Sequence, residues 1–125
     1  INDKHFNASE KRVAKELIKM LKTMEPLLPL SFSPSLYKTA KQHGEWMLKK
    51  KKFKHSQYVK DYRENLIGGV DDVRQAVLDL LVDYKVAGRG HRNTILFGRL
   101  KHIAVYELKD KKVAGLTPIF IQQFQ

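Results

Sequence analysis

Cysteine is absent from this chain of 125 residues, and so is any long apolar run. Without thiols the protein has no disulfide, no thiolate ligand for a metal ion and no cysteine nucleophile. No apolar run approaches the roughly 18 residues that a membrane-spanning helix needs, so we expect no transmembrane segment in this chain. Because the chain begins at Ile1 rather than at methionine, we expect a processed or trimmed chain whose upstream export signal or lipid anchor is not visible.

Acidic residues and arginine are also scarce relative to lysine. The 24 basic residues outnumber the 13 acidic ones, which gives a formal net charge of +11, and 18 of the basic residues are lysine. This charge favours contact with anionic polymers or membrane surfaces, and a lysine-coated protein without such a partner is the simpler alternative. Sequence-specific nucleic-acid binding is disfavoured, because base contacts rely on arginine and no zinc finger, RNP motif or basic zipper is present.

Hydrophobic residues are plentiful, at 42% of the chain, and they recur at helical spacing in three segments. This length and content predict a single domain with its own core. Polar residues at the expected N-cap positions mark where the helices begin: Asn7 or Ser9 for the first, Ser33 for the second, and Asp71 or Asp72 for the third.

The remaining pattern predicts strands after the helices. The third helix is expected to present an apolar face from Val73 to Tyr84. Short strands are expected near Glu64, over Leu100 to Leu108 and over Val113 to Phe124, with a hairpin turn at Asp110-Lys111. This order predicts an α+β fold in which helices pack on a small, mainly antiparallel sheet.

Two histidines and two acidic residues form the candidate polar site, which we assign to His55, Glu64, Asp83 and His91. Two neutral imidazoles are natural ligands for zinc or another divalent ion, with water in the open positions. Glu64 and Asp83 are then expected to orient those waters or the imidazole N–H groups from behind the ligands. The alternative is that both histidines only bridge loops through hydrogen bonds to carboxylates, since no HExxH pattern is present.

A run of lysines follows the predicted second helix and is the candidate ligand surface. It faces acidic glycans or anionic lipid heads in one interpretation, and it only complements the helix dipole in the other. The run consists of Lys49, Lys50, Lys51, Lys52 and Lys54.

Three further side chains near the site are expected to have structural roles. His43 lies one position from the buried stripe of the second helix, so we expect it at the surface or at the boundary of the core. Tyr58 and Tyr62 flank the loop that carries His55, and we expect them to pack this loop down, with the lining of a ligand groove as the alternative.

In this order, the polar segments resemble those of the CAP superfamily, also called the SCP domain, which includes cysteine-rich secretory, antigen 5 and plant pathogenesis-related proteins. The resemblance covers about residues 27–124. Phe53 to Ser56 is similar to the family's histidine-serine segment, Arg63 to Leu66 to its glutamate-asparagine segment, and Gly90 to Leu96 to the glycine-histidine-arginine segment of bacterial members. Leu80 to Asp83 falls where the family usually has tryptophan, two residues and an acid.

The sequence departs from the family's pattern at two points. Animal and plant members usually carry disulfides, so the lack of cysteine points to the bacterial branch. The acid at position 83 is aspartate, where the family commonly has glutamate, and the shorter side chain puts its reach into the site in question.

The resemblance implies a three-layer α-β-α sandwich, one domain over residues 1–125, whose cleft is lined by the four site residues. It further implies an exported protein, extracellular or at the cell surface, that acts as a binding module. Divalent metal, zinc above all, is the implied cofactor, and lipid, sterol, glycan or a host protein is the implied ligand. The alternative is a metal-dependent hydrolase or peptidase with Glu64 as the base.

Overall fold

The computed structural model describes residues 7–58 and 60–125, and it shows an α+β protein. The elements, in chain order, are α1 (Ala8–Thr23), β1 (Ser31–Phe32), α2 (Pro34–Lys50), β2 (Arg63–Gly68), α3 (Val73–Val82), α4 (Gly90–Ile95), β3 (His102–Leu108) and β4 (Ile119–Phe124). Within the described residues, no helix has the length and apolar content to cross a bilayer.

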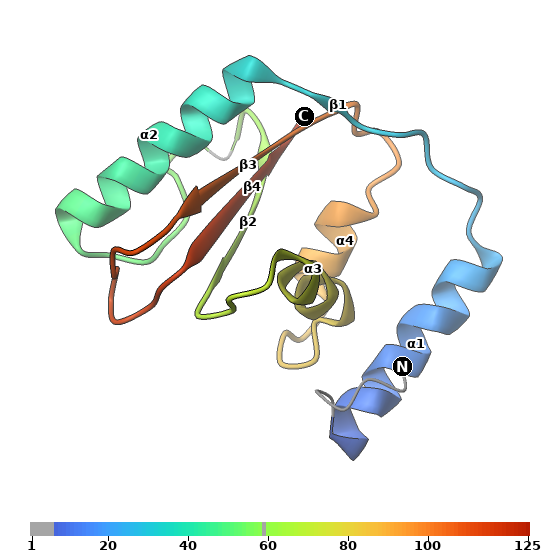
Figure 1. Cartoon of the computed structure of the whole chain (residues 1–125). Coiled ribbons are helices and arrows are strands. Elements are labelled where there is room, and N and C mark those ends of the chain that lie inside the picture. Colours follow the sequence, from blue (N-terminus) through green and yellow to red (C-terminus); the bar gives the residue numbers. More distant parts are fainter. Residues whose placement is uncertain (1–6, 59) are drawn as a thin grey trace.

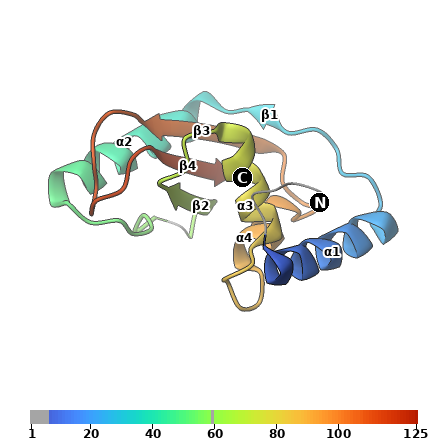
Figure 2. The ribbon, with the colours of Figure 1, turned by 60° about the horizontal axis from the view of Figure 1, so that its bottom comes forward.

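One small sheet forms the middle layer, with the strand order β1-β3-β4-β2. β4 pairs antiparallel with both of its neighbours, and the two-residue β1 runs parallel to β3. Helix α2 covers one face of the sheet and α3 and α4 lie against the other, with α1 packed on the outside of α3 (Figure 1). A second view shows α1 beside α3 and α4, away from α2 (Figure 2). The arrangement is the expected α-β-α sandwich.

Strand β4 shows that both faces of the sheet are covered, because all of its residues are buried. Side chains alternate along a strand, so its two faces carry different residues. Ile119 and Ile121 join Met47 of α2 in the main apolar core, and Gln123 lies on this same face. Gln122 and Phe124 occupy the opposite face, toward α3 and α4. A central strand thus presents one buried glutamine to each side.

The predicted N-caps of the helices are confirmed. Asn7 Oδ1 accepts a hydrogen bond from Glu10 N at 2.9 Å at the start of α1. Ser33 Oγ accepts from Leu36 N at 3.2 Å, and Asp72 Oδ1 accepts from Arg74 N at 3.0 Å. These contacts satisfy backbone donors that the first turn of a helix leaves without partners.

The structure corrects two details of the expected elements. The last strand begins at Ile119, not at Val113, because Pro118 has no N–H to donate to a ladder and Ala114 and Gly115 have positive φ. Helix α3 ends at Val82, so Tyr84 lies beyond it, and Val73 is 53% exposed rather than part of the apolar face.

Candidate functional site

His55 and Glu64 form one histidine–carboxylate pair. Glu64 is the second residue of β2, and its side chain is fully buried on the α2 face of the sheet. His55 lies in the loop between α2 and β2, with 53% of its side chain exposed. Its Nδ1 lies 3.0 Å from Glu64 Oε1. An ionised carboxylate only accepts, so Nδ1 carries a proton, and in the neutral form of the ring the lone pair lies on Nε2.

The surroundings of Glu64 favour its charged form. Burial by itself raises the pKa of this carboxyl, but hydrogen bonds from His55, from Ser56 N at 2.9 Å and from Gln123 Nε2 at 2.8 Å lower it below its ordinary value. The same contact raises the pKa of His55, because the bond to Glu64 outweighs the effect of burial. With its oxygens held by three protein donors, Glu64 is suited to positioning His55 and is a weak general base.

Two buried residues outside the predicted site, Gln123 and His43, hold the His55–Glu64 pair in place. Gln123 of β4 is fully buried and lies opposite Glu64 in the sheet. Its Nε2 donates to Glu64, and its Oε1 accepts from the hydroxyl of Thr39 on α2. The signal in the sequence was a glutamine pair inside an otherwise apolar strand, since a buried amide needs partners.

His43 is the second missed residue, and its expected place at the surface or boundary is wrong. It is buried, with 7% of its surface exposed, and its ring stacks on Trp46 at 5.6 Å. A backbone carbonyl only accepts, so His43 Nε2 donates to Lys54 O, at 2.7 Å. This bond fixes the chain immediately before His55, and it explains why a polar residue faces the core at this position.

His91 and Asp83 form the second histidine–carboxylate pair. Asp83 ends α3 in the left-handed conformation, at φ 54°, and its side chain is buried. Its Oδ1 lies 2.8 Å from His91 Nδ1, and its Oδ2 accepts from the N–H groups of His91 and Arg92 at 2.8 and 3.3 Å. Asp83 therefore caps α4 from a distance and orients the His91 ring. The shorter aspartate side chain reaches its histidine.

The arginine next to His91 is structural. Arg92 is 2% exposed, and its guanidinium donates to the carbonyls of Leu81 at 2.7 Å and Val82 at 2.8 Å. It also donates to Glu16 of α1, which Arg89 contacts as well, and these two arginines lower the pKa of Glu16. Arg92 thus satisfies the last carbonyls of α3 and ties α1 to the α3–α4 connection.

Asn65 connects the two pairs. It follows Glu64 in β2, so its side chain points to the opposite face of the sheet, where its Nδ2 donates to His91 O and to Gln122 Oε1, each at 3.2 Å. Among the described residues, no hydrogen bond or ion pair joins the His55–Glu64 pair directly to the His91–Asp83 pair. Within residues 7–58 and 60–125, no group of three or more His, Cys, Asp or Glu side chains is placed to hold a metal ion.

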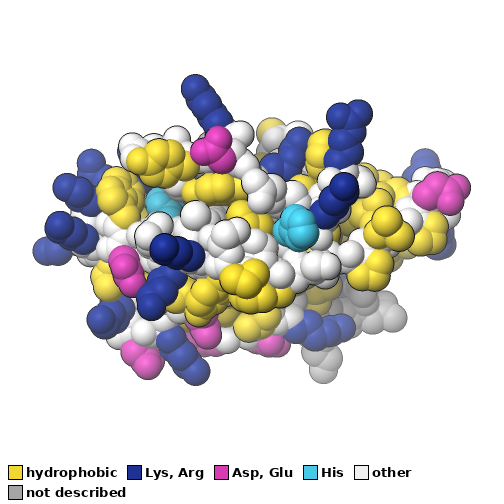
Figure 3. Space-filling model, turned by 90° about the horizontal axis from the view of Figure 1, so that it is seen from above, with side chains coloured by type: hydrophobic (Ala, Val, Ile, Leu, Met, Phe, Trp, Pro, Cys, Tyr) yellow, Lys and Arg dark blue, Asp and Glu magenta, His cyan; other side chains and the backbone are white. Residues whose placement is uncertain are grey.

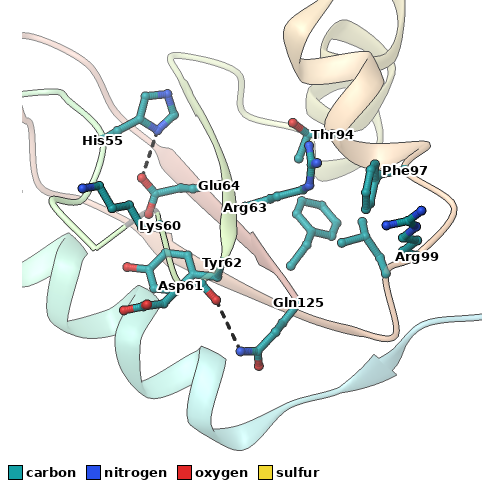
Figure 4. Close-up of a pocket in the computed structure, with 12 residues that line it drawn as sticks. His55, Lys60, Asp61, Tyr62, Arg63, Glu64, Thr94, Phe97, Arg99 and Gln125 are labelled. Carbon is teal, nitrogen blue, oxygen red and sulfur yellow. Dashed lines mark hydrogen bonds and ion pairs between the residues drawn. The ribbon is translucent and has the colours of Figure 1, made fainter.

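Two cavities adjoin His55. The first, of about 570 Å³, is the arginine cavity, lined among others by Lys60, Arg63, Phe97 and Arg99 (Figure 4). The second, of about 670 Å³, is the aromatic cavity, which is lined by residues of α2 and of the segments 54–58 and 61–62, among them Trp46, Tyr58 and Tyr62. His55, Asp61, Tyr62 and Gln125 line both cavities. His91 and Asp83 line neither of them.

The two tyrosines of the loop have different roles. Tyr62 packs the loop down as expected, because its hydroxyl donates to Ser56 Oγ at 2.8 Å. Tyr58 is 60% exposed and does not pack the loop down, although its ring lines the aromatic cavity. Both tyrosines line the aromatic cavity, as the alternative interpretation of a ligand groove expected.

The candidate lysine surface lies at the end of α2. Lys49 and Lys50 occupy the last turn and Lys51 is the C-cap, an arrangement that complements the helix dipole. Lysine and arginine side chains gather around this end of the molecule in the view from above (Figure 3). Lys54 differs from the others, because its ammonium lies over the Trp46 ring at 5.6 Å and it lines the aromatic cavity.

Comparisons with known proteins identify a similar fold but no family. No protein-family model matches the chain, and no curated protein matches it either. Among solved structures, the protein is similar to an outer surface protein from Borrelia burgdorferi, with a TM-score of 0.60 and 18% sequence identity. The alignment covers 92% of this chain and 86% of that chain. At this identity the similarity establishes a shared fold.

Proposed function

We propose that the protein is a CAP-type binding module, exported and exposed at the cell surface, whose His55 and His91 bind a divalent metal ion. The observation that carries the proposal is the pairing of each Nδ1 with a buried carboxylate. Metal-binding histidines usually donate their other ring nitrogen to such a group, which fixes the tautomer and leaves Nε2 for the metal. No hydrogen bond from the described residues occupies Nε2 of either ring.

In the proposed site, two imidazoles bind zinc and water completes the coordination. Two imidazole nitrogens are zinc ligands, and Glu64 and Asp83 stay behind them as orienting groups. Two protein ligands form an incomplete site, so the affinity is modest and depends on pH through the protons that compete for both rings. A bound ion supplies positive charge at which an anionic or carbonyl oxygen of a ligand binds.

Binding is a better account of the site than hydrolysis. The residue that a metal-dependent hydrolase needs as its base is Glu64, and its oxygens already accept three hydrogen bonds in a fully buried position. Surface location is supported by the neighbour in fold, which is an outer surface protein. Protease treatment of intact source cells is expected to remove the protein, and its survival contradicts surface exposure.

Zinc titration of metal-stripped protein by calorimetry tests the metal site. We expect saturable one-to-one binding that is lost in His55→Ala and in His91→Ala alike, because both rings are ligands of one ion. His102→Ala is the matched control, since His102 is an exposed histidine on β3 outside the candidate site. Equal heats for the wild type and both site variants contradict the proposal and favour a purely structural role for the two pairs.

A further inference from the structure

The lining of the arginine cavity has an excess of positive charge, because Lys60, Arg63 and Arg99 outnumber its acids, Asp61 and Glu64. Arg63 begins β2, and its guanidinium lies 3.7 Å from the centre of the Phe97 ring, which holds it in a stacked position. Arg99 and Lys60 line the same cavity and are exposed. Among the described residues, none of these three has a carboxylate within 4.0 Å.

The acids of this cavity do not offset the arginines. Glu64 is fully buried and engaged by His55. The carboxylate of Asp61 lies at the other end of the cavity from Arg63 and Arg99, as Figure 4 shows. In the same view, Thr94 lies beside Arg63, so a hydroxyl and two guanidinium groups face one end of the cavity. Such groups recognise sulfate, phosphate or carboxylate through paired hydrogen bonds.

The adjoining aromatic cavity has a different and complementary lining. The exposed ring of Tyr58 offers a flat apolar surface, while Gln42 and Gln57 add exposed amides and Ser35 adds a hydroxyl. An acyl chain leaves these polar groups without partners, whereas a sugar presents an apolar ring face together with hydroxyls. Each cavity has the volume of an ordinary small-ligand site, and their shared wall makes them adjacent.

We infer that the two cavities form one groove that binds an acidic oligosaccharide. The sulfate or carboxylate of one sugar lies against Arg63 and Arg99, and a neighbouring sugar stacks on Tyr58. The inference deepens the proposed binding function by naming a ligand class, and it rests on that function only in this respect. The groove lies apart from the lysines at the end of α2, because Lys49, Lys50, Lys51 and Lys52 line neither cavity.

Calorimetry with a heparin-derived tetrasaccharide at physiological salt tests the inference. We expect saturable binding to the wild type, weaker by at least about tenfold in Arg63→Gln/Arg99→Gln, since paired hydrogen bonds to a charged group are lost. The matched control is Lys49→Gln/Lys50→Gln, which removes the same charge from the exposed end of α2 and weakens binding less than about threefold through long-range, screened attraction. Tyr58→Ala is expected to weaken binding without changing its salt dependence.

Several results overturn the inference. Equal losses in the arginine and lysine double variants show that the attraction is diffuse. Equal binding of uncharged cellotetraose removes the role of the arginines, and binding to phosphatidylglycerol vesicles but not to the tetrasaccharide identifies a lipid surface instead. If the arginine double variant fails to fold by circular dichroism, Arg99→Gln alone replaces it, since this exposed side chain has no ion pair among the described residues. The zinc titration has an independent readout, so a negative result in one experiment leaves the other proposal standing.

Discussion

Replacing Glu64 by leucine tests whether the buried carboxylate organises the site. Leucine is similar in volume but accepts no hydrogen bond, so His55 Nδ1, Ser56 N and Gln123 Nε2 all lose their acceptor. Ser56 and Gln123 are buried, and each buried donor left without a partner costs about 1–3 kcal/mol. The added apolar contact offsets part of this loss, so we expect the free energy of unfolding to fall by about 3 kcal/mol, as for other broken buried pairs.

The assay is urea unfolding at pH 7, followed by circular dichroism and extrapolated to water. Glu45→Leu is the matched control, because Glu45 is an exposed acid on α2 and the chemical change is identical. Glu64→Gln keeps one accepting oxygen, so its loss is expected to be about half as large. A Glu64→Leu variant within about 1 kcal/mol of Glu45→Leu refutes the assignment of Glu64 as an organising residue.

Three further changes follow from the same contacts. The pKa of His55 is raised above its ordinary value of 6.5, so the charged ring stabilises the fold fully below pH 6.5, and this stability is lost as pH rises through the raised pKa. Glu64 has a lowered pKa and is therefore already ionised over this pH range. The stability difference between wild type and His55→Ala in urea is therefore expected to be larger at pH 6 than at pH 9, and a constant difference contradicts this. Arg92→Ala is expected to lower the free energy of unfolding in urea by about 3 kcal/mol, because the carbonyls of Leu81 and Val82 and the carboxylate of Glu16 lose a buried donor. Arg74→Ala, at an exposed position on α3, is expected to change this free energy little. Met47→Ala, at a fully buried core position of α2, is expected to cost about 2–5 kcal/mol, and a loss below about 1 kcal/mol by thermal melting contradicts the core assignment.

Local signals made much of the fold predictable. The caps at Asn7, Ser33 and Asp72 act within three residues of each helix start, so their chemistry is visible in a short stretch of sequence. Short polar segments that interrupt apolar ones marked His55, Glu64, Asp83 and His91 as candidates, and their role as a site stays a prediction. Their pairing as His55 with Glu64 and His91 with Asp83 depends on the fold and was not fixed in advance.

Long-range contacts account for what the sequence left open. His43 is buried because its partner is the carbonyl of Lys54, on a loop that returns over the helix, and helical spacing carries no information on that loop. The role of Gln123 depends on its register opposite Glu64 across two strands and on Thr39 from the helix above them. The late start of β4 depends on the positive φ values at Ala114 and Gly115, which a strand pattern does not reveal.

The central claim is that His55 and His91 hold one metal ion. The most direct measurement is anomalous diffraction at the zinc edge from crystals grown with zinc. The account predicts one peak about 2.0–2.1 Å from Nε2 of both rings, with Nδ1 still bound to Glu64 and Asp83. A peak that contacts only one of the two histidines, or no peak at either ring, contradicts it.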